Sequence, residues 1–164
     1  LLAEHHGLST KGTGDFMREL SFKYGYSDIT QFLVEYVSEH PEVDHQVDEE
    51  QRIFGKENDN FVLDAHLGFH FVPDSIRICL ICDLEEAARR ILDDIERTTE
   101  DATNISESMA TSQKRRDTMQ KNFMSLYQID INDHSNFDLV LDTTTLSSVE
   151  AFELVSAFID LRST

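Results

Sequence analysis

The sequence predicts an α/β protein built on an open parallel sheet with flanking helices. The short runs 61–63 and 76–82 are apolar and rich in β-branched residues, with almost no alternation. Strands that are buried on both faces of a parallel sheet have this pattern. Amphipathic helical patterns separate the runs, as in β-α-β units. Parallel sheets carry their sites at the carboxyl ends of strands, so the residues that follow 61–63, Asp64 to His66, are the first candidates.

Composition narrows the class of protein. The 164 residues fit one domain, 1–164, and carry 32 acidic against 14 basic side chains, a formal charge of −18. Such a surface repels phosphate backbones, so we expect no nucleic-acid partner. No apolar run approaches the roughly 18 residues that a membrane span needs, so we expect no membrane partner either. We expect a monomer that acts on small molecules.

The two cysteines, Cys79 and Cys82, form a C-x-x-C. In a helix this spacing could indicate redox chemistry or half of a metal site. Here it lies inside a predicted strand, where residues three apart point to opposite faces. We interpret both as buried structural thiols, and we expect a reducing, cytoplasmic setting without a secretory leader.

The first third of the chain alternates strand and helix. Residues 1–6 read as the end of a helix that Gly7 terminates, and 8–10 as a short strand. An α/β domain rarely opens in this way, so we expect a strand and a loop before Leu1.

Three helices follow as one insertion. The segment 13–20 can be capped by Thr13 or Asp15. An acidic helix runs from Pro41 to about residue 54. Between them, the segment 27–38 places four apolar side chains on one helical face: Ile29, Phe32, Leu33 and Tyr36.

The second half contains two expected capping boxes. Asp83 with Glu86 opens a helix with an apolar face, and Ser147 with Glu150 opens the closing helix. A last apolar strand covers 137–141. The apolar face of the first helix consists of Leu84, Ala87, Ala88, Ile91, Leu92 and Ile95, and that of the closing helix of Ala151, Val155, Phe158 and Ile159.

Between these helices lies a polar segment, 98–112, that is acidic and rich in Ser and Thr. Its composition is typical of a mobile segment or a lid. Lys114-Arg115-Arg116 then opens a helical stretch to about Tyr127, and this is the densest positive cluster in an acidic chain.

The candidate site residues have competing interpretations. Asp64 ends an apolar strand, where a carboxylate can hold Mg²⁺ through water or can simply cap a turn. His66 can contact a substrate or serve the structure. Phosphate recognition favours Arg, whose planar fork bonds two oxygens, whereas surface salt bridges are the alternative for each Arg. The well-placed guanidinium groups are Arg18, Arg89, Arg90, Arg115 and Arg116, and they flank the acidic segment as a closing lid requires.

A phosphate-cradling loop is not found in these residues. The six Gly build no G-x-x-x-x-G-K-S/T. The residues by themselves therefore predict only an α/β protein with a lid that Arg residues flank.

Several segments, in this order, resemble the cytidylate kinase branch of the nucleoside monophosphate kinases. TGDFMREL at 13–20 is similar to a family segment whose Arg holds the monophosphate, and FVLDAHLG at 61–68 to a strand-end acid segment near the metal. DLEEAARRI looks like the helix that supplies Arg to the triphosphate. SQKRRDTMQKNF resembles the lid-proximal helix, and FDLVLDTTTLSSVE the final strand and helix.

The resemblance implies a P-loop kinase fold and phosphoryl transfer from ATP, with Mg²⁺, to CMP or dCMP. It implies that 15–54 is the monophosphate-binding insertion and 98–112 the lid. By position, Thr13, Gly14 and Arg18 would hold the monophosphate together with His66 and Arg115, Asp64 would orient the metal through water, Arg89 would contact ATP, and Arg90 and Arg116 would clamp the transferring oxygens.

The sequence also departs from the family pattern. The first strand and the Gly-rich loop would lie before Leu1, His66 stands where many relatives have Arg, and Asn122 where a second lid-side Arg is usual. We therefore expect the 164-residue chain itself to be inactive. The alternatives are a non-catalytic relative that acts as a regulatory or interaction module, and a kinase for another monophosphate.

Overall fold

The computed structural model describes residues 1–40, 42–94 and 104–162. They form two compact units, Leu1–Ser75 and Ile76–Thr164. Each unit combines helices with a small parallel sheet, so the predicted α/β class is confirmed. A single continuous sheet is not what the described residues form: each unit has its own two-stranded sheet. None of the helices within the described ranges is long and apolar enough to cross a membrane.

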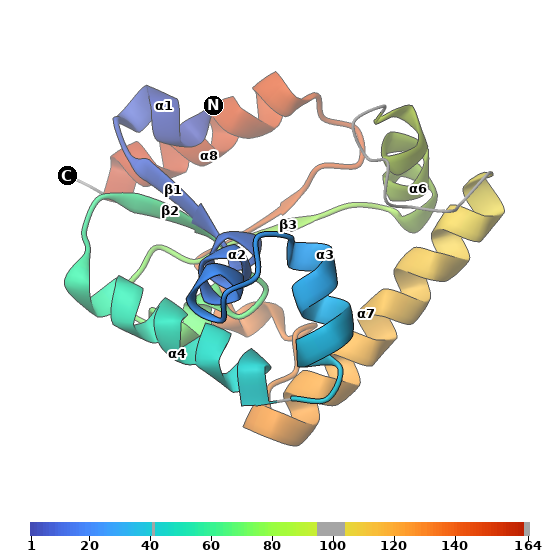
Figure 1. The fold of residues 1–164 in the computed structure, drawn as a ribbon. Helices are drawn as coiled ribbons and strands as arrows, with labels where there is room; N and C mark the ends of the chain where they lie inside the picture. The colour runs from blue at the N-terminus through green and yellow to red at the C-terminus, as the bar shows by residue number, and fades with distance from the viewer. Residues whose placement is uncertain (41, 95–103, 163–164) are drawn as a thin grey trace. The chain divides into compact units, whose positions relative to one another are not determined.

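In the first unit, two strands meet in parallel. Helix α1 (Leu2–His6) ends at Gly7, whose φ of 65° is the left-handed conformation that Gly adopts without strain. Strand β1 (Ser9–Gly12) pairs with β2 (Phe61–Asp64), as Figure 1 shows. Gly12 stands opposite Asp64 in the register, so both strands end at the same edge.

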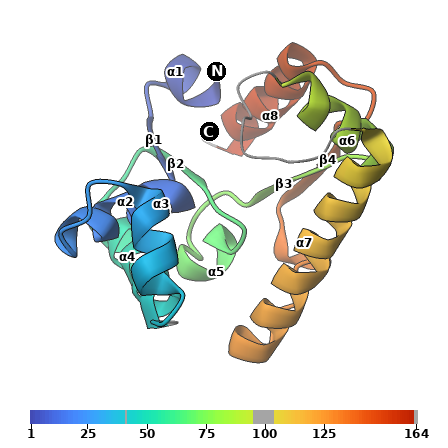
Figure 2. The same ribbon diagram turned by 45° about the vertical axis from the view of Figure 1, so that its right-hand side comes forward.

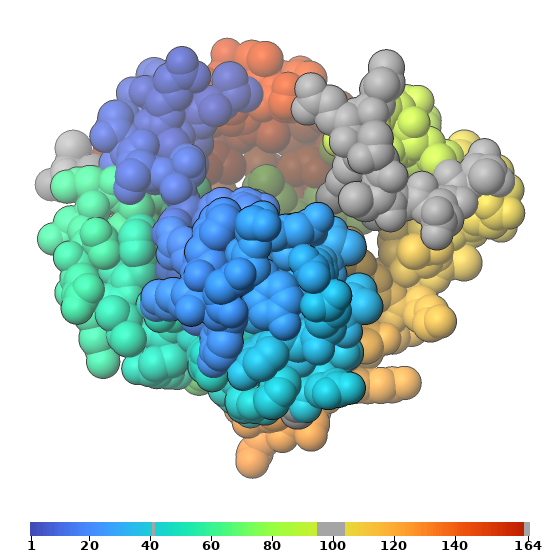
Figure 3. Space-filling view, viewed as in Figure 1, coloured from blue at the N-terminus to red at the C-terminus, as the bar shows by residue number. Residues whose placement is uncertain are grey.

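The connection between β1 and β2 is the expected helical insertion. It consists of α2 (Thr13–Lys23), α3 (Ile29–Phe32) with a π-helical continuation η1 (Leu33–Val37), and α4 (Glu42–Glu57). Helices α2 and α3 present a continuous outer surface (Figure 3). The core beneath is apolar and buried, and it consists of Phe16, Leu20, Phe32, Val43 and Val47.

One expectation for this insertion is wrong, and another concerns a residue outside the described ranges. Leu33, expected on the buried face, is 41% exposed. Phe32 takes the buried position and Tyr36 packs against the core, so Leu33, about 100° round the helix from Phe32, lies at the edge of the apolar face. The expected start of the third helix, Pro41, lies outside the described residues.

The turn after β2 is held by close packing. Helix α5 (Gly68–Phe71) follows Leu67, which is 2% exposed, and Val72 comes next. Gly55 of α4 faces Val72 so closely that a Cβ at Gly55 would lie 2.5 Å from Val72 Cγ2. The glycine thus lets α4 approach the segment that follows the candidate site.

In the second unit, β3 (Ile78–Ile81) pairs in parallel with β4 (Leu139–Asp142). The guanidinium of Arg77 donates to both carboxylate oxygens of Asp138, at 3.0 and 3.1 Å, just before the two strands begin. The prediction that such strands are buried on both faces is wrong for Leu80, which is 58% exposed. The side chains of a strand point alternately to the two faces of its sheet, and the face on which Leu80 lies is left largely uncovered.

Helices α6 (Leu84–Asp93) and α7 (Ile105–Tyr127) pack together in this unit (Figure 2). Asp83 caps α6 as predicted, with Oδ1 accepting from the amides of Glu85 and Glu86 at 2.9 and 3.3 Å. The other half of the predicted box is wrong, because the amide of Asp83 donates to Thr144 Oγ1 instead.

Helix α7 begins earlier than expected. The sequence predicted a helix from Lys114, but Asn104 Oδ1 accepts from the amide of Glu107 at 3.0 Å and caps a helix that starts at Ile105. The expected lid, 98–112, is therefore helical over 105–112, and 98–103 lies outside the described residues. The role of a lid stays a prediction.

The chain closes with the turn η2 (His134–Asn136), β4 and α8 (Ser148–Arg162). The capping box of Ser147 and Glu150 is confirmed in full. Glu150 Oε2 accepts from the amide of Ser147 at 2.8 Å, and the amide of Glu150 donates to Ser147 Oγ at 3.2 Å. Val155 is buried on the predicted apolar face.

Candidate functional site

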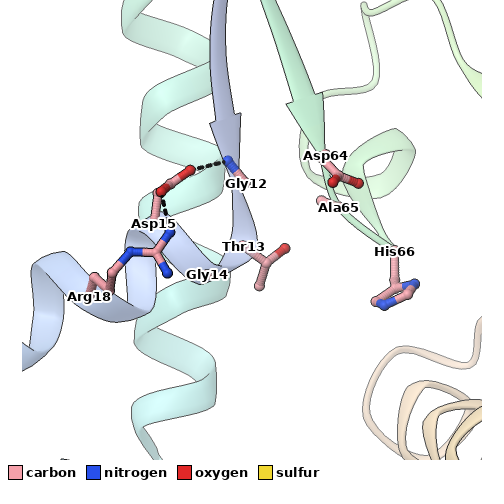
Figure 4. Close-up of a pocket in the computed structure, with 8 residues that line it drawn as sticks. All are labelled: Gly12, Thr13, Gly14, Asp15, Arg18, Asp64, Ala65 and His66. Atoms are coloured by element: carbon pink, nitrogen blue, oxygen red, sulfur yellow. Dashed lines mark hydrogen bonds and ion pairs between the residues drawn. The ribbon is translucent and has the colours of Figure 1, made fainter. Parts of the chain in front are cut away.

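A pocket of about 420 Å³ opens at the carboxyl ends of β1 and β2. Its wall is formed by two turns, one entering α2 and one following β2 (Figure 4). The parallel register of the two strands brings these turns together. The lining residues are Gly12, Thr13, Gly14, Asp15, Arg18, Asp64, Ala65 and His66.

The turn into α2 is organised by Asp15. Its Oδ2 accepts from the amide of Gly12 at 2.7 Å, and its Oδ1 accepts from Arg18 Nη2 at 2.5 Å. The Arg18 guanidinium and the Gly12 amide together hold the pKa of the Asp15 carboxyl below its ordinary value of 3.8. Asp15 is thus a carboxylate at neutral pH, and it joins the end of β1 to the guanidinium of Arg18 in the second turn of α2.

This turn is suited to an anion. The amides of the first helical residues, Thr13 and Gly14, stand at the positive end of the α2 dipole. Arg18 lies one turn further along, and a Cβ placed on Gly14 would be 3.6 Å from its Nη1. Backbone amides and a guanidinium group therefore meet at Gly14, and both donate hydrogen bonds to phosphate or carboxylate oxygens.

The facing turn brings a carboxylate and an imidazole to the same pocket. Asp64 is the last residue of β2, and both Asp64 and His66 are exposed. The Thr13 side chain lies between the turn into α2 and Asp64 (Figure 4). Within the described ranges no group of three His, Cys, Asp or Glu side chains could enclose a metal ion. A single carboxylate fits an ion that keeps most of its waters, as Mg²⁺ does.

The predicted Arg residues of α6 have partners inside the second unit. Arg89 bonds Glu86 through Nε and Nη2, at 2.9 and 2.8 Å, and Asp93 through Nη1 at 2.7 Å. Arg90 Nε donates to Glu86 at 2.7 Å. These two guanidinium groups lower the pKa of Glu86 to about 2, and Arg89 makes the larger contribution. Arg90 Nη2 reaches three carbonyl oxygens at 2.8 to 3.2 Å, those of Thr143, Thr144 and Leu146.

The Arg pair of α7 is less constrained. Arg116 donates to Asn132 Oδ1 through Nη2 at 2.7 Å. Arg115 is exposed, and none of the described residues bonds its side chain. The structure thus gathers one group of predicted site residues in the first unit: Thr13, Gly14, Arg18, Asp64 and His66. Arg89, Arg90, Arg115 and Arg116 belong to the second unit.

Sequence reasoning missed one member of the pocket that matters. Asp15 was expected only as a possible helix cap, and its contact with Arg18 was not foreseen. The i,i+3 spacing of Asp15 and Arg18 on a helix was the available signal.

Comparison with known proteins also indicates a kinase relationship. No family model matches the chain. A cytidylate kinase from Pyrococcus horikoshii is 30% identical over 160 residues, which cover 97% of this chain and 79% of that protein. The chain belongs to the cytidylate kinase family. A second member, the cytidylate kinase of Pyrobaculum islandicum, is 33% identical over 144 residues, 87% of this chain and 73% of that protein.

Membership in the cytidylate kinase family confirms the kinase-like relationship that the motifs indicated. Another similar protein is larger: the S-adenosylmethionine-dependent nucleotide dehydratase of Lacinutrix mariniflava is 32% identical over 143 residues, which make up 87% of this chain but 28% of that protein. A solved structure of an uncharacterized protein from Eubacterium ventriosum has a TM-score of 0.68 at 11% identity, over 97% of this chain and 87% of that one. This last likeness concerns the fold alone.

Proposed function

We propose that this member of the cytidylate kinase family binds CMP or dCMP through the phosphate, in the pocket at the ends of β1 and β2. The observation that carries the proposal is the meeting of the Thr13 and Gly14 amides with the Arg18 guanidinium, opposite Asp64. In a strongly acidic chain, this is a local concentration of positive groups at a strand-end cavity. The choice of CMP or dCMP as the nucleotide rests on the names of the similar cytidylate kinases.

The proposed chemistry is transfer of the γ-phosphoryl group of ATP to a phosphate oxygen of CMP, with ADP and CDP as products. The amides of α2 and Arg18 would hold the acceptor phosphate and offset its charge, so that its oxygen can approach the donor. Asp64 would hold Mg²⁺ through water, and the ion would neutralise charge on the transferring group. His66 would contact the substrate from the facing turn.

A P-loop kinase arrangement, a lid at 98–112, and phosphate contacts from Arg89, Arg115 and Arg116 are part of the proposal. Arg115, an exposed cation without a bond to the described residues, fits such a role best. No G-x-x-x-x-G-K-S/T occurs in the 164 residues, so we expect this chain alone to bind CMP without turning over ATP.

Isothermal titration calorimetry with CMP tests the proposal. R18M keeps the length of the side chain and removes the guanidinium, which should weaken CMP binding about tenfold or more, since hydrogen bonds to charged groups contribute roughly 1.5–3 kcal/mol. The matched control is K23M, which removes one positive charge from the same helix, where Lys23 pairs with Glu50. Equal affinity of R18M and K23M for CMP would exclude the phosphate site. A chain that binds neither CMP nor ATP would instead support an interaction module.

A further inference from the structure

The contacts of Asp15 indicate a function beyond helix capping. We propose that Asp15 is a positioning residue, which fixes the Arg18 guanidinium beside the first turn of α2 so that it is ordered before an anion arrives. The proposal deepens the proposed phosphate site and rests on it.

The two carboxylate oxygens of Asp15 join the backbone at the end of β1 to the exposed side chain of Arg18. Gly12, whose amide donates to Oδ2, is the last residue of β1 and is paired in register with Asp64. Arg18, which donates to Oδ1, has a side chain that is 55% exposed. An exposed Arg samples many rotamers when it has no partner. Asp15 therefore transmits the fixed position of the strand end to the guanidinium (Figure 4).

The pairing leaves Arg18 able to bind a ligand. Asp15 uses Nη2, and within the described part of the chain no residue bonds Nε or Nη1. Nη1 is the nitrogen that lies nearest to Gly14, where the helix amides begin. A phosphate at this turn can thus accept from Nη1 and the amides while Asp15 keeps its own bond.

The negative charge of Asp15 acts in the opposite direction. A carboxylate beside a phosphate repels it, so a simple electrostatic account predicts that removing this charge tightens CMP binding. Positioning predicts the reverse. The sign of the change therefore distinguishes the two.

The test begins with D15N and CMP calorimetry on the full chain. Asn can still accept from the Gly12 amide through its single oxygen, so the helix start is kept, whereas its amide nitrogen is a donor and cannot accept from the guanidinium, so the bond to Arg18 is lost. We expect the Kd for CMP to rise about fivefold to tenfold, within the range of couplings between contacting residues. E19Q removes one acidic charge from the same helix, where Glu19 pairs with Lys11 rather than Arg18, and should change the Kd less than twofold. Unchanged or tighter binding by D15N overturns the proposal.

A double-mutant cycle shows whether Asp15 acts through Arg18. In the R18M background, D15N should change the Kd for CMP less than twofold. The same loss in both backgrounds would assign the effect to the helix end and overturn the positioning role.

A measurement without ligand separates this inference from the proposed function. The Arg18 side-chain N–H signals in ¹⁵N NMR should exchange with water more slowly in the wild-type chain than in D15N. Equal exchange overturns positioning even if CMP binds. Failure of the wild-type chain to bind CMP defeats the phosphate site, and slow exchange would then still support the contact.

Discussion

The contacts of Arg90 predict that it stabilises the second unit through the loop between β4 and α8. Arg90 Nη2 donates to the carbonyl oxygens of Thr143, Thr144 and Leu146 at 2.8, 3.2 and 3.1 Å. These carbonyls lie 53 to 56 residues away in the chain, so the guanidinium joins α6 to the loop that leads into the Ser147 cap. The perturbation is R90M, which keeps the aliphatic stem and removes all donors.

The size of the effect follows from these bonds. Hydrogen bonds from a charged group contribute roughly 1.5–3 kcal/mol when buried, and removal leaves backbone carbonyls to find water. The Arg90 side chain is 38% exposed, so water compensates part of the loss. We expect R90M to lower the free energy of unfolding by about 1–2 kcal/mol.

Urea unfolding and amide hydrogen exchange measure this effect. R89M is the matched control, because Arg89 is the adjacent residue and contacts Glu86 and Asp93 from a side chain that is 53% exposed. Exposed pairs contribute about 0–1 kcal/mol. R90M should also speed amide exchange in the 143–147 loop, whereas R89M should not. Equal unfolding free energies for the two variants would refute the reasoning, and Arg90 would then remain available for phosphate as the family resemblance implies.

Three further predictions concern stability. Arg77 lowers the pKa of Asp138 from 3.8 to about 2, so the stabilisation by this carboxylate is fully present above about pH 4 and is lost as the pH falls through 2. D138N should therefore lower the free energy of unfolding by about 1–2 kcal/mol at pH 7 and by little at pH 2. Equal losses in urea unfolding at both pH values would contradict this prediction. S147A should lower the free energy of unfolding by about 1 kcal/mol in the same assay, because both halves of the capping box are present; no loss would argue against the cap. G55A should lower the free energy of unfolding by about 1–3 kcal/mol despite the better helix propensity of Ala, because its Cβ would lie 2.5 Å from Val72 Cγ2. A gain in thermal stability would instead show that the Val72 side chain moves to make room for the new methyl group.

Local signals in the sequence were sufficient for much of the fold. Gly7, Asp83 and Ser147 mark helix boundaries that the structure confirms, since capping depends on residues close in the chain. The early start of α7 at Ile105 was missed because the polar composition of 98–112 outweighed the cap at Asn104.

Long-range partners limited the prediction of the site. The strand-end rule selected Asp64 and His66, and the structure places both in one pocket with Thr13, because parallel pairing fixes which strand ends meet. The partners of Arg90 could not be foreseen, since carbonyl acceptors leave no trace in residue identity. In an acidic chain every Arg has nearby acids, so sequence alone could not separate Arg115, which bonds none of the described residues, from the paired Arg89.

The central claim is that the phosphate of CMP is held at the start of α2. The most direct measurement is a titration of the ¹⁵N-labelled chain with CMP, followed by amide NMR, with cytidine as the ligand that lacks phosphate. We expect the Thr13 and Gly14 amide signals to shift with CMP but not with cytidine, and we expect R18M to need about tenfold more CMP for the same shift. Shifts with CMP that leave these two amides unchanged, or the same titration midpoint in R18M as in the wild-type chain, would contradict this claim.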